Sequence, residues 1–365
     1  MVGEGAVPVP AALMLVATLA MPFLATAARS EPAAPVILHY LNAPAGGQPL
    51  MRPPTLYLTV AGARHRAVLD TGSTGVVVAA RSLDAFDALE DIGPGEITYT
   101  SSGRVMRGRY VLAPVTVEGA GGARITTRPL PVLAVTHIEC LAHARSCTPD
   151  DAARRVAMIG IGFGRERDRQ PNATPGRNPF LNLPAMAQPA GASDLANIKA
   201  GGLGRGYVLT RASAQVGLAP GDEAGFEMVK LSSSEVPGDW SSMPVCLSLA
   251  GRRPPACGAM LMDTGVARMF ISVPGAQSAG LLVHNGRGSP VLADGTRIAL
   301  LPAPGAAAPD VSFTIGDDAD PMAPSEALVV YRPGRPAFIN TTVRFLNRYD
   351  YLFDADAGRV GLKAR

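Results

Sequence analysis

Two aspartates in this sequence have surroundings that could support chemistry. Asp70 and Asp263 each open an Asp-Thr-Gly tripeptide after apolar residues, in AVLDTGSTGVVV (67–78) and MLMDTGVARMF (260–270). Two carboxylates about 3 Å apart cannot both ionise easily, so a pair brought together would hold one proton between them. The ionised member could deprotonate a water while the protonated member donates to a carbonyl oxygen. The pattern favours general acid–base hydrolysis of an amide without a covalent intermediate.

Both aspartates are expected to stand at the ends of hairpin strands. Residues 54–70 read PTLYLTVAGARHRAVLD, in which apolar and polar side chains alternate before a turn at Ala61-Gly62. Residues 243–263 repeat the plan as MPVCLSLAGRRPPACGAMLMD, with the bend at Gly251 and the residues after it. A glycine after Asp-Thr permits a tight turn and a close approach of backbone to a neighbour. Each carboxyl would therefore be held by a rigid strand.

A second internal repeat, which we call the second echo, indicates that the chain is duplicated. Residues 207–220 (YVLTRASAQVGLAP) align without gaps with residues 351–364 (YLFDADAGRVGLKA), and each copy follows its own Asp-Thr-Gly. Residues 165–206 are rich in Pro, Gly, Asn and Ala and are expected to form long surface loops leading to a crossover near residue 200. The sequence shows no sustained amphipathic helix. These features predict an all-β protein of two diverged lobes.

The chain resembles the pepsin-like aspartic peptidases over roughly residues 50–365. Two motifs contain the aspartates, VLDTGSTGVVV and LMDTGVARMF, and a third is the VGLKA ending. The segment EITYTSSGRVMRGRYVLAPVTV is similar to the family's flap hairpin. The segment MIGIGFG (158–164) is similar to the family's strand behind the first catalytic turn. The resemblance implies bilobal double-ψ β-barrel lobes with a cleft between them. It implies an N-terminal lobe over 28–200 carrying Asp70 and the flap, and a C-terminal lobe over 201–365 carrying Asp263.

Residue roles follow from the same resemblance. Asp70 and Asp263 would be the catalytic pair of an aspartic-type endopeptidase, and Tyr99 would lie on the flap over the substrate. The residues expected to support the pair are Thr71, Gly72, Ser73, Thr264 and Gly265. The two threonines would tie the turns together, and the Ser73 hydroxyl would bond the outer oxygen of Asp70. The partner would be a peptide or protein substrate, with no metal and no organic cofactor.

Three residues depart from the family pattern or stand out beside it. Val266 occupies a position that usually carries Thr or Ser, so Asp263 is expected to lose a hydroxyl donor. We therefore expect the pH range of activity to extend toward neutral pH, and we expect Val266→Thr to reverse this shift. Asn340 is expected to stand where the family has Gly in the strand behind its second catalytic turn. Arg268 would lower both carboxyl pKa values if it reached the pair, or else lie on the surface. The alternative function is a catalytically impaired pepsin-fold protein that binds peptides or inhibits a partner.

The four cysteines form two close pairs. Cys140 lies seven residues before Cys147, and Cys246 lies eleven before Cys257. The spacing predicts two short-loop disulfides in an oxidising compartment. A zinc site is the alternative, and the absence of CxxC spacing and of HExxH makes it the weaker one.

The N-terminus and the charge bear on location and partners. Residues 11–27 are an apolar run ending in Ala-Thr-Ala, which predicts a signal peptide over 1–27 and a secreted or periplasmic protein. The stretch before this run has no Lys or Arg, which leaves a mis-assigned start or an uncleaved anchor as alternatives. A formal charge of +3 without a basic cluster argues against nucleic acid. After signal cleavage we expect a monomer that does not associate with membranes.

Overall fold

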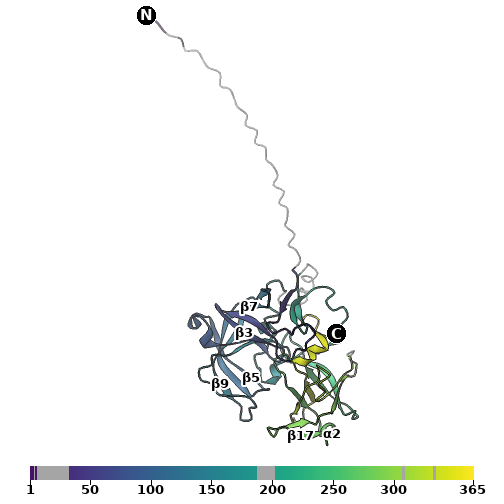
Figure 1. Cartoon of the computed structure of the whole chain (residues 1–365). Coiled ribbons are helices and arrows are strands. Elements are labelled where there is room, and N and C mark those ends of the chain that lie inside the picture. The colour runs from purple at the N-terminus through teal and green to yellow at the C-terminus, as the bar shows by residue number, and fades with distance from the viewer. Residues whose placement is uncertain (4, 6–32, 187–201, 306–308, 332–333) are drawn as a thin grey trace. The chain divides into compact units, whose positions relative to one another are not determined.

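The computed structural model describes residues 1–3, 5, 33–186, 202–305, 309–331 and 334–365. Unit Ala33–Arg365 is compact by itself and contains every strand found among the described residues. In Figure 1, β3, β5, β7 and β9 lie together in one part of this unit, whereas β17 and α2 lie in another. The apolar run 11–27 of the predicted signal peptide and the crossover near residue 200 fall outside the described residues.

The first large sheet holds nine strands in the order β5-β6-β9-β4-β10-β3-β2-β7-β8. Its strands are β2 (Thr55–Val60), β3 (Ala63–Asp70), β4 (Thr74–Ala79), β5 (Asp91–Tyr99), β6 (Arg104–Ala113), β7 (Val115–Glu118), β8 (Arg124–Thr126), β9 (Leu130–Cys140) and β10 (Ala157–Ile161). Alternate residues of β2 are buried, as its sequence predicts, whereas every residue of β4 is buried. β4 lies between β9 and β10, which explains its continuous apolar sequence.

The second large sheet repeats this order with every strand twelve places later, as β17-β18-β21-β16-β22-β15-β14-β19-β20. Its strands are β14 (Met243–Leu249), β15 (Ala256–Leu261), β16 (Met269–Ser272), β17 (Leu282–His284), β18 (Pro290–Leu292), β19 (Arg297–Pro302), β20 (Val311–Thr314), β21 (Ala327–Val329) and β22 (Ala337–Asn340). β10 pairs parallel with β3 and antiparallel with β4, and β22 pairs with β15 and β16 in the same two senses. The duplication read from the sequence is therefore confirmed strand by strand.

A six-stranded sheet joins the two halves in the order β1-β12-β11-β23-β24-β13. Its strands are β1 (Val36–His39), β11 (Gly204–Leu209), β12 (Ser213–Leu218), β13 (Glu227–Lys230), β23 (Tyr349–Asp354) and β24 (Arg359–Ala364). The two echoing segments form its hairpins β11–β12 and β23–β24, which meet where β11 and β23 run antiparallel. At this junction the ring of Phe163 stacks on Phe353 at 4.1 Å. The second echo thus forms the bridge between the lobes.

Helical structure is confined to short pieces among the described residues. They are η1 (Ala80–Ser82), η2 (Phe86–Ala88), η3 (Glu166–Asp168), η4 (Pro175–Arg177), α2 (Gly275–Ser278) and η5 (Val343–Asn347). The all-β, bilobal prediction is confirmed. No helix within the described ranges is both long and apolar enough to cross a membrane.

Both predicted disulfides are present. Cys140, at the end of β9, is bonded to Cys147 in the loop that follows. Cys246 of β14 is bonded to Cys257 of β15, its direct partner in the hairpin register. The zinc alternative for these four cysteines is therefore excluded, because the sulfur atoms are used in disulfides.

Candidate active site

The first aspartate stands at the end of β3, and a three-residue turn separates it from β4. The side chain of Asp70 is 4% exposed. Its Oδ1 accepts a hydrogen bond from the Gly72 amide at 2.7 Å, and its Oδ2 accepts one from the Ser73 hydroxyl at 2.6 Å. Both donors favour a charged carboxylate, and the role predicted for the Ser73 hydroxyl agrees with this geometry.

The second aspartate follows β15 in the equivalent turn. Asp263 is 5% exposed, and its Oδ1 accepts from the Gly265 amide at 2.9 Å, as in the first turn. Its Oδ2 differs, because Val266 has no hydroxyl to donate. The side-chain amide of Asn340, at the end of β22, donates to this oxygen at 2.6 Å. The expected loss of a hydroxyl donor is therefore observed, but the expectation that the charged carboxylate of Asp263 is thereby left without a donor on Oδ2 is wrong, because an amide from a different strand supplies one.

The expected position of Asn340 also needs correction. Asn340 pairs with Leu261, two residues before Asp263, and with Phe270, seven residues after it. In the first lobe, the residue paired two before and seven after Asp70 is Met158, opposite Val68 and Val77. Asn340 is thus the counterpart of Met158 and not of Gly160. Its side chain faces the cleft, as does that of Met158, because both residues line it.

The two threonines lock the turns together. Thr71 Oγ1 donates to the Met262 carbonyl and accepts from the Thr264 amide at 2.9 Å. Thr264 Oγ1 donates to the Leu69 carbonyl at 2.7 Å and accepts from the Thr71 amide at 3.1 Å. Both residues are buried. Each hydroxyl therefore satisfies two backbone groups of the opposite turn, and the tie predicted between the turns is observed.

Close contact across the two turns requires both glycines. A Cβ placed on Gly72 would lie 2.6 Å from the carboxyl atoms of Asp263. A Cβ on Gly265 would lie 2.3 Å from Asp70 Oδ1. Any side chain at either position would push the opposite aspartate away. The glycines therefore let each turn approach the other aspartate.

The carboxyl groups of the pair interact directly. Burial raises the pKa of Asp263 well above its usual value, and the negative charge of Asp70 and a hydrogen bond between the two carboxyls raise it further. The Asn340 amide and the more distant Arg165 guanidinium act in the opposite direction on this pKa. Such a pair retains a proton at pH values where isolated carboxyls have lost theirs.

Residues after β10 support the first turn from below, although the sequence predicts surface loops there. Gln170 is 3% exposed; its Nε2 donates to the Gly72 carbonyl at 3.0 Å and its Oε1 accepts from the Thr74 amide at 3.2 Å. Arg165 is equally buried and forms an ion pair with Asp168 at 2.5 Å. A lone Gln or Arg in a Pro- and Gly-rich segment carries no sequence signal of such a role.

The hairpin β5–β6, which we call the flap, carries Tyr99 to the pair. The Tyr99 hydroxyl is buried beside Ser73 and Asp70, although it makes no hydrogen bond of ordinary geometry with the described residues. Burial, and then the charge of Asp70, raise the pKa of this phenol, so it stays protonated and can donate. The prediction of Tyr99 on the flap agrees with this placement.

The loop closed by the Cys140–Cys147 disulfide holds the tip of the flap. Within it, the Arg145 and Ser146 amides donate to the Ser102 carbonyl at 2.9 and 3.0 Å. The Arg145 guanidinium donates to the Thr100 carbonyl at 3.1 Å and lies 5.3 Å from the centre of the Phe270 ring, which belongs to the other lobe. The disulfide loop therefore fixes the flap and contacts the opposite side of the cleft.

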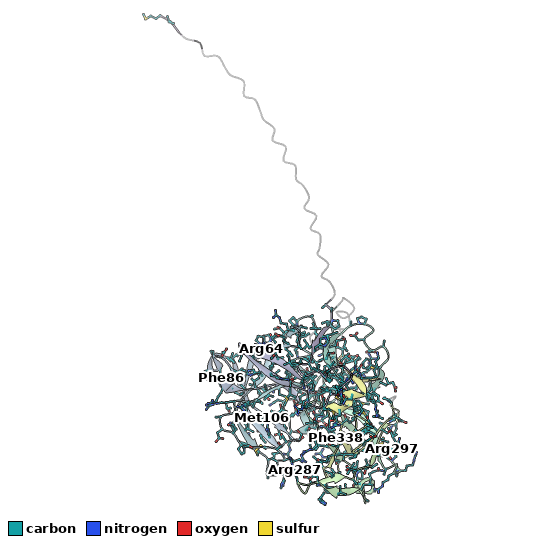
Figure 2. The ribbon with its side chains drawn as sticks, viewed as in Figure 1. Arg64, Phe86, Met106, Arg287, Arg297 and Phe338 are labelled. Atoms are coloured by element: carbon teal, nitrogen blue, oxygen red, sulfur yellow. A yellow bond between two sulfur atoms is a disulfide. The ribbon has the colours of Figure 1, made fainter. Side chains whose placement is uncertain are left out.

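Asp70 and Asp263 share one cleft of about 340 Å³. Met106 and Met158 from the first lobe and Phe270 and Phe338 from the second line it together with polar flap residues. Figure 2 labels one lining residue from each lobe, Met106 of β6 and Phe338 of β22. The cleft thus combines apolar walls with an acidic pair.

Arg268 takes no part in the pair. Its side chain is 43% exposed, and its Nε lies 3.5 Å from Glu326 Oε1. The surface alternative for Arg268 is therefore the right one. Within the described ranges, no group of three or more His, Cys, Asp or Glu side chains is arranged to hold a metal ion.

Comparison with known proteins supports the fold. The chain is similar to the crystal structure of an aspartic proteinase from Irpex lacteus, with a TM-score of 0.53 and 12% sequence identity over 91% of this chain and 97% of that one. No model of a known protein family matches the sequence, and no curated protein matches it either. At this identity the likeness concerns the fold, which is therefore pepsin-like, as the motifs predicted.

Proposed function

We propose that this protein is an aspartic endopeptidase that hydrolyses peptide bonds with a water activated by Asp70 and Asp263. The observation that carries the proposal is the carboxyl pair itself. Two turns from opposite lobes, each fixed by the other's threonine, bring two buried carboxyls into contact in one cleft. Burying two acids against each other costs free energy, and such arrangements cluster at functional sites.

The reaction follows from the single shared proton. The ionised carboxyl takes a proton from a water held between the two groups, and the water oxygen bonds to the carbonyl carbon of the peptide. The protonated carboxyl gives its proton to the carbonyl oxygen, which produces a tetrahedral gem-diol. One carboxyl then returns a proton to the nitrogen as the C–N bond breaks and the other removes a proton from a gem-diol hydroxyl. The pair ends with one proton, as it began.

The flap and the cleft suit an extended peptide. A strand-like substrate can form backbone hydrogen bonds with the edge of the flap, and apolar side chains can pack on Met106, Met158, Phe270 and Phe338. Tyr99 would close over the scissile bond with its phenol protonated. We propose substrates with apolar residues on both sides of that bond.

We also propose that the protein acts outside the reducing cytoplasm, as a monomer, without nucleic acid or membrane partners. Two disulfides and no free cysteine among the described residues are compatible with an extracellular or periplasmic location. If residues 1–27 are a cleaved signal, the mature protein begins at Ala28. Mass spectrometry of the exported chain tests this cleavage site.

The function is tested with denatured casein or haemoglobin between pH 3 and 7, with and without pepstatin. We expect cleavage that pepstatin blocks, and a loss of at least about 1,000-fold in kcat for Asp70→Asn and for Asp263→Asn, since each variant leaves the pair unable to serve as both acid and base. The matched control is Asp354→Asn. Asp354 is also a buried carboxylate that accepts a backbone amide, but it lies in the sheet between the lobes.

Two results would contradict the proposal. The first is cleavage that persists in both cleft variants, which would identify a contaminating protease or another site. The second is tight binding of peptides or pepstatin by the unaltered protein without any turnover from pH 3 to 7. That second result would favour the impaired, peptide-binding alternative.

A further inference from the structure

Asn340 uses both ends of its side-chain amide. Its Oδ1 accepts a hydrogen bond from the Thr342 backbone amide at 3.1 Å. Its Nδ2 donates to Asp263 Oδ2 at 2.6 Å. Asn340 is 5% exposed, and so is the carboxyl that it contacts. Because the backbone N–H can only donate, the oxygen of the amide must face it, and the NH2 group must face Asp263.

In the first lobe, a different residue type donates to the equivalent carboxyl oxygen. There, the Ser73 hydroxyl in the turn itself donates to Asp70 Oδ2 at 2.6 Å. Val266 holds the equivalent position in the second turn, three residues after Asp263, and has nothing to donate. The second donor therefore comes from β22, at the position that Met158 occupies in the first lobe.

We propose that Asn340 is a positioning residue of the catalytic pair, which replaces the missing hydroxyl of the second turn and holds Asp263 Oδ2 as a hydrogen-bond acceptor. The proposal rests on the proposed peptidase function for its effect on catalysis. Its effect on the titration of the pair does not depend on that function.

An amide restricts the protonation of the carboxyl oxygen that it contacts more than a hydroxyl does. A hydroxyl can rotate and accept a hydrogen bond from a neutral carboxyl, whereas an NH2 group held by its own carbonyl can only donate one. Asn340 therefore disfavours a proton on Asp263 Oδ2 and leaves the shared proton to the other carboxyl oxygens. A hydrogen bond to the charged form also lowers the pH at which the pair loses its first proton.

Other groups that face Asp263 act on the same titration. Asp70 contributes a like charge from the first turn, the Arg165 guanidinium contributes a positive charge from the segment after β10, and the Tyr99 phenol approaches from the flap. Substitution of Asn340 or Val266 changes none of these groups. A difference between such variants is therefore expected to report the donor.

The test compares four proteins: the unaltered chain, Asn340→Leu, Val266→Thr, and the double variant. Leucine has nearly the shape of asparagine without a donor. The readout is kcat/KM for denatured casein as a function of pH. We expect Asn340→Leu to move the acid limb upward by about one pH unit, because a hydrogen bond to a charged group is lost. Val266→Thr should reverse most of this shift in the Leu background, and move the profile less in the unaltered one.

A matched control separates titration from packing. Asn347 is also a buried asparagine, but its amide contacts only backbone, donating to the Leu50 and Pro321 carbonyls and accepting from the Leu50 amide. Asn347→Leu should lower the melting temperature without moving the acid limb. An equal shift in the control, or no shift in Asn340→Leu, overturns the proposal. Failure of Val266→Thr to rescue also overturns it.

A measurement on the unaltered chain needs neither activity nor a variant that folds. The Nδ2 protons of Asn340 should show NMR shifts that follow the titration of the carboxyl pair, with signals assigned from Asn-labelled protein. A resonance that does not change between pH 2 and 7 contradicts the proposal even if the protein cleaves casein. A resonance that titrates supports it even if no cleavage is found, in which case only the peptidase function fails.

Discussion

The two large sheets share one strand order but differ at one hairpin. In the first lobe, β5 and β6 have nine and ten residues and form the flap over the carboxyl pair. Their counterparts β17 and β18 have three residues each, and Leu282 and Val283 of β17 are 43% and 46% exposed. Duplication thus produces a near-symmetric pair of aspartates. The longer hairpin of the first lobe covers the cleft on one side.

The same contrast recurs at the level of single hydrogen bonds. Both aspartates accept a glycine amide on Oδ1, and both turns exchange threonine hydrogen bonds, so these features are symmetric. The donors to Oδ2 are asymmetric, a hydroxyl from the turn on one side and an amide from a neighbouring strand on the other. Symmetry is therefore kept in the bonds to Oδ1 and between the turns, and lost only in the donor to Oδ2.

The strongest test of this symmetry is Gly72→Ala against Gly265→Ala. Each new Cβ would displace the opposite aspartate. We expect each variant to lose about 100-fold or more in kcat while circular dichroism stays unchanged, because an error of about 1 Å in the position of a catalytic group has that cost. Full activity in either variant would show that the turns do not need the close approach.

A second test compares Thr71→Val with Thr264→Val by urea unfolding. Each change leaves two buried backbone groups of the opposite turn without a partner, so we expect each to cost about 3 kcal/mol. Because the four bonds form one network, the double variant should lose clearly less than the sum of the single losses. If the double variant lost the full sum of the two single losses in free energy, the four bonds would not form one network.

The two disulfides provide a comparison that should separate stability from function. We expect Cys140→Ser/Cys147→Ser and Cys246→Ser/Cys257→Ser each to lower the free energy of unfolding by about 2 kcal/mol, since both close short loops. Only the first pair should also raise KM, because only that loop holds the flap tip. Equal KM values for the two double variants would argue against a role of the loop at the cleft.

The smallest predicted effect concerns stability and pH. Because the pKa of Asp263 is raised by folding, the folded protein binds more protons than the unfolded chain above about pH 4. The free energy of unfolding should therefore fall as the pH rises from about 4 toward the folded pKa. Asp263→Asn should lose less stability over this range than the unaltered protein, as measured by urea unfolding at pH 4 and 7. An identical pH dependence in both proteins would refute the raised pKa.

Much of this arrangement could be predicted from short stretches of sequence. The hairpins ending in Asp70 and Asp263, the two echoes and both disulfides follow from alternation, turn residues and spacing, which neighbours along the chain determine. The contacts of Thr71, Thr264 and Ser73 and the place of Tyr99 on the β5–β6 hairpin agree with the family resemblance, whereas their roles in catalysis stay predictions. What the resemblance implied for Asn340 was wrong, because a motif comparison does not fix strand register.

The sequence by itself determined which residues lie at the turns and that the chain is built twice. Only the tertiary structure decided which distant side chains complete these turns. Asn340 is 77 residues from Asp263, and Gln170 is 98 residues from Gly72, so their contacts depend on how distant strands and loops align. A shift of one residue in β22 would turn Asn340 to the opposite face of its sheet. Such long-range contacts are therefore set by packing of the whole lobe and not by local pattern.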